Sequence, residues 1–94
     1  MIIAISNFTV TNEEAELIAA RFSRRSRKVD RHRGFLGLDV LSKTTVQGTT
    51  FMLMTRWTNR AALRAYLTSD DFRVVHAESS EQQAEFAVYE VVAN

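Results

Sequence analysis

The sequence predicts a single α+β domain over residues 1–94, with the element order β-α-β-β-α-β. Three observations support this order: alternating patterns at both ends of the chain, two stretches with apolar residues at helical spacing, and two central strand-like runs separated by a short glycine turn. The order is typical of the split βαβ, or ferredoxin-like, sandwich, whose antiparallel sheet carries both helices on one face. The other face would then lack a cover, so the sequence also predicts that two chains pack sheet to sheet.

The first strand and the first helix are expected in the first third of the chain. Residues 2–10, IIAISNFTV, alternate as a strand does, and the alternation puts Asn7 on one face with two isoleucines. Thr11 and Glu14 have the spacing of a capping box, which predicts a helix from about Asn12. Its apolar stripe, interrupted once, predicts that the helix continues to about Asp30.

The middle of the chain predicts a hairpin. A strand begins near Phe35, Gly48 lies in the turn TTVQGT, and the run TTFMLMTRW predicts a third strand that ends at Trp57. The short connection favours antiparallel pairing of these two strands.

A broken second helix and a last strand complete the predicted fold. Thr58 can cap the helix NRAALRAYLTS, and Ser69 can cap a second segment, SDDFRVVH, so a break is expected at Ser69. The alternating run AEFAVYEVVA, residues 84–93, predicts the last strand. The expected core consists of large apolar side chains on the inward faces: Ile18, Phe22, Phe35, Leu53, Leu63 and Phe72.

Composition excludes several classes of function. The chain has no cysteine, which excludes disulfides, thiolate zinc sites and a cysteine nucleophile, and its net charge of +1 creates no strong overall field. No run of about 20 apolar residues suggests a membrane span, and the N-terminus lacks the basic region of a signal peptide. We therefore expect a cytoplasmic protein without a membrane partner.

The basic segment RFSRRSRKVDRHR, residues 21–33, raises the alternative of RNA binding. The run RGFLGLDVL is similar to the RNP1 motif of RNA-recognition domains, but it falls on the second strand, and RNP1 belongs on the third. We interpret the basic residues as the solvated back of the first helix and expect no nucleic-acid partner.

Four side chains are candidates for chemistry. His76 falls on the inward face of its short helix, and Asn7 lies in the middle of a strand where a buried amide needs a partner. Trp57 ends the third strand, and Tyr66 lies on the inner stripe of the second helix. Each also has a purely structural interpretation as a satisfied core residue. His32 lies in the charged run DRHR, and we expect it to be exposed.

The ordered segments SNFTV, GFLGLDVL, MTRW and AYLTSDDFRVVH resemble the antibiotic-biosynthesis-monooxygenase superfamily, above all its IsdG-type haem-degrading monooxygenases. The resemblance implies a homodimeric α/β-barrel with a cleft between the sheet and the helices of each subunit. It also implies that His76 ligates haem iron, that Asn7 reaches the other face of the haem, and that Tyr66 replaces a tryptophan that presses on the ring. Trp57 matches another tryptophan of the family.

Two further functions stay open beside haem degradation. Cofactor-free members of the superfamily oxidise phenolic or anthrone-like aromatics with O₂, and Asn7, Trp57 and Tyr66 fit that chemistry nearly as well. There His76 would be the base, and Asn7 and Trp57 would stabilise an oxyanion. The third is a non-enzymatic dimeric module that binds a small molecule, because fold alone does not fix function.

Overall fold

The computed structural model describes residues 1–78 and 85–94, and the side chains of residues 1–74 and 85–94. The elements in chain order are β1 (Ile2–Val10), α1 (Asn12–Ser23), the 3₁₀ helix η1 (Lys28–Arg31), β2 (Phe35–Thr45), β3 (Gly48–Trp57), α2 (Arg60–Leu67), α3 (Asp70–Glu78) and β4 (Glu85–Glu90). This arrangement confirms the predicted α+β ferredoxin-like fold.

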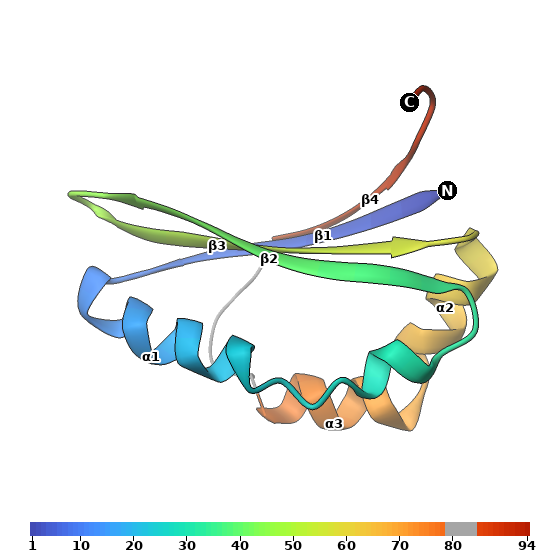
Figure 1. Ribbon diagram of the computed structural model, residues 1–94, viewed down its shortest axis with the longest axis horizontal. Helices are drawn as coiled ribbons and strands as arrows, with labels where there is room; N and C mark the ends of the chain where they lie inside the picture. Colours follow the sequence, from blue (N-terminus) through green and yellow to red (C-terminus); the bar gives the residue numbers. More distant parts are fainter. Residues whose placement is uncertain (79–84) are drawn as a thin grey trace.

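The four strands form one antiparallel sheet in the order β2-β3-β1-β4. The β2–β3 hairpin is as predicted, with Val40 opposite Leu53 in its middle. In the described part of the chain, α1, α2 and α3 all lie on one side of the sheet (Figure 1).

The core between sheet and helices has two clusters. One lies under α2 and η1 and is built from Ile2, Ala4, Val29, Trp57, Leu63 and Tyr66. The other lies under α1 and is built from Val10, Ile18 and Phe51, with Phe8 and Phe22 packed against it. Of the expected core residues, Ile18 and Leu63 are buried, whereas Phe22, Phe35, Leu53 and Phe72 are half-buried.

The first helix is shorter than the sequence predicts. α1 ends at Ser23 instead of continuing to Asp30, and the chain turns at Arg27, which adopts a left-handed φ of 61°. The turn lets η1 carry Val29 into the cluster beside Trp57, where it is 6% exposed. Burial of this valine therefore outweighs continuation of the helical stripe.

The three expected caps, at Thr11, Thr58 and Ser69, can be compared with the structure directly. The Thr11 hydroxyl accepts a hydrogen bond from the Glu14 amide, and the Ser69 hydroxyl accepts one from the Phe72 amide, as predicted. The N-cap of α2 is Asn59 and not Thr58, because the Asn59 side chain accepts from the backbone of the first turn.

The alternation of β1 decides which side chains meet the helices. Ile2, Ala4 and Val10 belong to the two core clusters, so the residues of β1 with even numbers face the helices. The odd-numbered residues face the side of the sheet that no described helix covers. In the described segments, no helix is long and apolar enough to cross a membrane.

Candidate active site

Asn7 lies on the uncovered face of the sheet. Its register with Ile3 and Ile5 is as expected, but the helices cover the other face of β1, so the amide does not point into the space between sheet and helices. The inward position next to it is Ser6, which is half-buried opposite Leu53. Asn7 was expected to reach into a cleft between sheet and helices, but the structure places it on the opposite face of the sheet.

Trp57 and Tyr66 lie together in the core. Their rings stack with centroids 5.4 Å apart and an interplanar angle of 27°. Trp57 is completely buried, and its indole Nε1–H donates to the Thr55 hydroxyl at 2.9 Å. Trp57 is thus a core residue whose indole N–H already has a hydrogen-bond acceptor. Tyr66, its stacking partner, lies on α2.

His32 is half-buried, and the expectation of an exposed histidine is wrong. Its side chain is 21% exposed, and its Nε2 lies 2.9 Å from Asp71 Oδ2 at the start of α3. Its ring also meets Tyr66 edge-on, with centroids 4.9 Å apart. The histidine therefore connects the segment after η1 with both α2 and α3.

The environment of Tyr66 favours a protonated phenol. Burial raises the pKa of Tyr66 above its ordinary value of 10.0, the charge of Asp71 raises it further, and the charge of Arg25 opposes both. Within the described residues the hydroxyl makes no hydrogen bond, and it is not sealed away from solvent. A rigid buried ring with an unused donor is well suited to bind an oxygen atom of a ligand.

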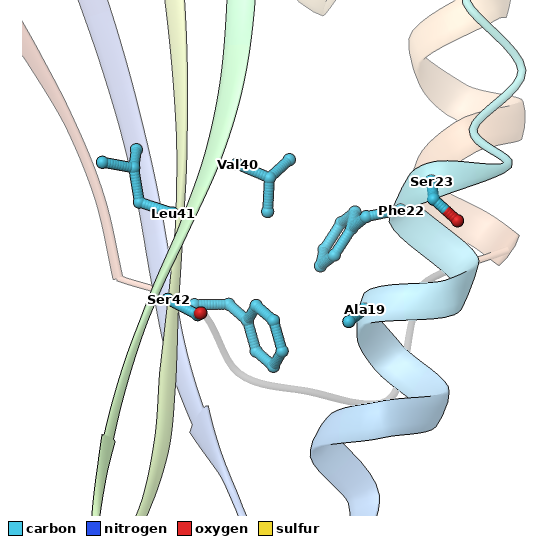
Figure 2. A pocket seen from close by; sticks show the side chains of 7 residues that line it. Ala19, Phe22, Ser23, Val40, Leu41 and Ser42 are labelled. Carbon is cyan, nitrogen blue, oxygen red and sulfur yellow. The ribbon is translucent and has the colours of Figure 1, made fainter.

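An apolar cavity lies between α1 and the β2 side of the sheet. Its volume is about 280 Å³, and it is lined by Ala19, Phe22, Ser23, Val40, Leu41, Ser42 and Phe51. Figure 2 shows the side chains of Phe22 and Val40 pointing toward each other across this space, whereas Leu41 points to the other side of the sheet.

Aromatic rings form much of the cavity wall. Phe22 and Phe51 lie 5.7 Å apart by their ring centroids, and Phe8 stacks on Phe51 at the same separation. The Ser23 hydroxyl is used within α1, where it donates to the Ala20 carbonyl. Ser42 adds a second hydroxyl to the wall. Such a surface fits a small, flat, mainly apolar molecule.

The end of α1 links the cavity with Tyr66. Phe22 and Ser23 line the cavity, and Arg25, one turn further on, is close enough to lower the pKa of the Tyr66 hydroxyl. Arg25 itself is paired with Asp30, with Nη1 3.1 Å from Oδ1. The segment at the end of α1 therefore lies near both the cavity and Tyr66.

Two of the residues considered for haem binding are placed by the structure. His32 is engaged with Asp71, and Asn7 lies on the face of the sheet away from the helices. No group of three or more histidines and acidic residues gathers for a metal in the described chain. The haem hypothesis depends on His76, which belongs to α3 by its backbone but whose side chain lies outside the described residues.

Sequence reasoning missed His32 and the cavity. A histidine inside the run DRHR carries no local sign of burial, because its partner Asp71 follows 39 residues later. The cavity lies beside the last turns of α1, and the interruption of the apolar stripe at Ser26 was the one sign in the sequence that this helix ends early.

The family model described as antibiotic biosynthesis monooxygenase matches residues 1–78. The chain belongs to this family. The match covers the five elements from β1 to α2 together with η1 and α3, so it includes every residue of the cavity, Tyr66 and His32. No curated protein matches the sequence.

Solved structures of the family share the fold over almost the whole chain. A Bacillus cereus protein named after the same family is 25% identical, with a TM-score of 0.77 over 99% of this chain and 94% of its own. SnoaB, a cofactor-independent oxygenase from Streptomyces nogalater, is 19% identical, with a TM-score of 0.78 and the same coverage. A MhuD mutant with two manganese protoporphyrin IX molecules bound per active site is 21% identical, with a TM-score of 0.79 over 100% and 97%.

Proposed function

We propose that this protein is a cofactor-independent monooxygenase that oxidises a small aromatic substrate with O₂. The observation that carries the proposal is the cavity of about 280 Å³ with its phenylalanine walls, in a chain of the antibiotic biosynthesis monooxygenase family. Ligand pockets usually span about 300–1,000 Å³, and this cavity lies just below that range, so it suits a compact aromatic molecule. The structural similarity to the cofactor-independent oxygenase SnoaB supports the same chemistry.

In this reaction the substrate itself reduces oxygen. An anthrone-type substrate loses a proton from its CH₂ group, and the resulting carbanion gives an electron to O₂ and forms a C–O bond. The peroxide then loses water and leaves a carbonyl, so one oxygen atom enters the product and the other leaves as water. No external reductant is required, because the CH₂ group supplies all four electrons.

The protein would contribute binding and charge stabilisation. Phe22 and Phe51 would hold the aromatic rings of the substrate. The apolar walls would favour a substrate anion whose charge is delocalised over its rings. The Tyr66 hydroxyl, held protonated by its raised pKa, would donate to the substrate oxygen on which negative charge develops. His76 is proposed as the base that removes the first proton, as expected from the sequence.

Anthrone and O₂ provide the direct test. Purified protein should consume one O₂ per anthrone and form anthraquinone, in the presence of a metal chelator and without added reductant. Tyr66→Phe should lower kcat, because it removes a hydrogen bond made to developing charge, and Phe22→Ala should mainly raise KM. Arg64→Ala, an exposed change on the same helix as Tyr66, is the matched control and should leave both constants unchanged. Rates equal to those without protein would contradict the proposal.

Haem degradation is the second candidate. The manganese protoporphyrin complex of MhuD and the location of His76 on α3 support it. Titration of the purified protein with ferric haem, followed by the Soret band, separates the candidates. Stoichiometric uptake that is lost in His76→Ala would replace the cofactor-independent proposal with haem degradation.

A homodimer is the proposed assembly. The sheet face opposite the helices carries Ile3, Ile5, Met52 and Met54, and no described element covers it. A second copy that packs its own sheet against this face would remove these side chains from water.

A further inference from the structure

His32 connects three elements at the border of the proposed site. It directly follows η1, its Nε2 lies 2.9 Å from Asp71 Oδ2 in α3, and its ring meets the edge of Tyr66 in α2. Both polar partners are half-buried, so water competes weakly for the contact.

The Tyr66 ring is held by neighbours on three sides. It stacks on Trp57, meets Phe72 edge-on at 5.4 Å, and meets His32 edge-on at 4.9 Å. Trp57 and Phe72 are core side chains fixed by packing. His32 differs from them, because its own position depends on the contact with Asp71.

We infer that His32 is a positioning residue that, together with Asp71, holds the Tyr66 ring so that the phenol hydroxyl remains directed at the substrate. The inference rests on the proposed function, in which Tyr66 donates a hydrogen bond to the substrate. His32 is not among the residues that line the cavity, and its ring meets Tyr66 directly, so we assign it an effect through Tyr66.

The contact can persist in either charge state of the imidazole. A neutral ring with the proton on Nε2 donates to the Asp71 carboxylate, and a protonated ring donates to it as a charged pair. Among the described residues, Arg31, 3.8 Å from Asp71, and Arg25 after α1 also place charges near this carboxylate and phenol. The contact therefore serves to orient the ring and requires no proton transfer.

A double-mutant cycle tests whether His32 acts through Tyr66. His32→Phe keeps an aromatic edge against Tyr66 but cannot bond to Asp71, and His32→Gln keeps a donor but removes the ring. Each variant is made in the wild-type and in the Tyr66→Phe background, and kcat and KM for anthrone are measured. In the wild-type background we expect kcat to fall by about tenfold with KM nearly unchanged, and in the Tyr66→Phe background we expect no further loss. Equal losses in both backgrounds would overturn the inference.

A second measurement does not depend on activity. If His32 fixes the buried ring, His32→Gln should admit water beside it and shift the ionisation of Tyr66 back toward its ordinary pKa of 10.0, as followed by phenolate absorbance. His32→Phe keeps an aromatic ring there and should shift it less. Arg31→Gln removes the weaker contact with Asp71 and leaves His32 in place, so it is the control and should not shift this ionisation. Fluorescence of Trp57, the single tryptophan, reports whether the stack with Tyr66 is retained.

The two measurements separate failure of the inference from failure of the proposed function. If the wild type lacks oxygenase activity and His32→Gln still shifts the Tyr66 ionisation, the proposed function fails and the positioning role is kept. An unshifted ionisation in folded His32→Gln would overturn the positioning role, whatever the activity. Asp71→Asn, which keeps an acceptor oxygen for a neutral His32 and removes the charge, should retain more activity than His32→Phe.

Discussion

At the scale of single residues, the site depends on a few side chains whose partners are far apart in sequence. Tyr66 has a buried ring, a hydroxyl with no hydrogen bond to the described residues, and opposite charges from Asp71 and Arg25 nearby. Burial removes the phenol from water and so keeps it neutral. A neutral phenol still has its O–H group and can donate a hydrogen bond. His32 adds the orientation that a packed ring alone does not guarantee.

The raised pKa of Tyr66 predicts a loss of stability in alkali. Unfolded tyrosine ionises near 10.0, but the folded phenol keeps its proton to higher pH, so the unfolded state releases its proton first. This contribution to stability is complete below pH 10.0 and is lost as the pH rises through the folded pKa. Urea unfolding between about pH 9 and about pH 11 should show a steeper loss for the wild type than for Tyr66→Phe. Parallel pH profiles of the two proteins would contradict the assignment.

At the scale of elements, the sequence predicted the order of strands and helices but not the faces they present. Alternation in β1 was clear, yet both faces are apolar, with Ile2 and Ala4 on one and Ile3 and Ile5 on the other. Only packing against the helices decides between them, which is why Asn7 was expected in the cleft and lies outside it. The end of α1 also depends on tertiary burial, that of Val29 beside Trp57.

The packing of α2 on the sheet predicts a large effect of one leucine. Leu63 is 5% exposed and belongs to the same cluster as Trp57 and Tyr66. Leu63→Ala should lower the free energy of unfolding by about 2–5 kcal/mol, through lost apolar contact and the space left behind. The exposed neighbour Arg64→Ala should change it little. Denaturant melts measure both, and a loss below about half a kcal/mol in Leu63→Ala would mean that α2 is packed differently.

The junction between η1 and β2 predicts a strict need for glycine at position 34. Gly34 has a left-handed φ of +84°, and a Cβ atom there would lie 2.5 Å from Ala62 Cβ and 2.7 Å from Thr58 Oγ1. Gly34→Ala should therefore cost more than the roughly 1–2 kcal/mol of left-handed backbone alone, because the start of α2 must also move. Gly34→Asn tolerates this backbone better but keeps the clash, so thermal melts should show that it loses nearly as much. A near-native melt of either variant would contradict this close approach.

At the scale of the whole molecule, the fold leaves one face of the sheet uncovered. Among the described elements, the helices occupy one side only, and the other side carries Ile3, Ile5, Met52 and Met54 across β1 and β3. An ion pair between Arg56 and Asp39, 2.9 Å apart, lies on the same face where β3 meets β2. An apolar centre with a charged pair beside it is the pattern of an interface.

This face predicts how the assembly can be broken without unfolding the subunit. Ile5 lies near the middle of the sheet, opposite Met54 on β3 and Ala87 on β4. Ile5→Lys would place a charge in the centre of the proposed interface, where it has no partner, so the variant should sediment as a monomer at micromolar concentration. Leu17→Lys is the matched control, because Leu17 is 55% exposed on α1, away from the sheet, and this variant should remain dimeric. Both variants should keep the wild-type circular dichroism spectrum. A wild-type protein that sediments as a monomer under these conditions would contradict the dimer, and a dimeric Ile5→Lys variant would mean that another surface joins the subunits.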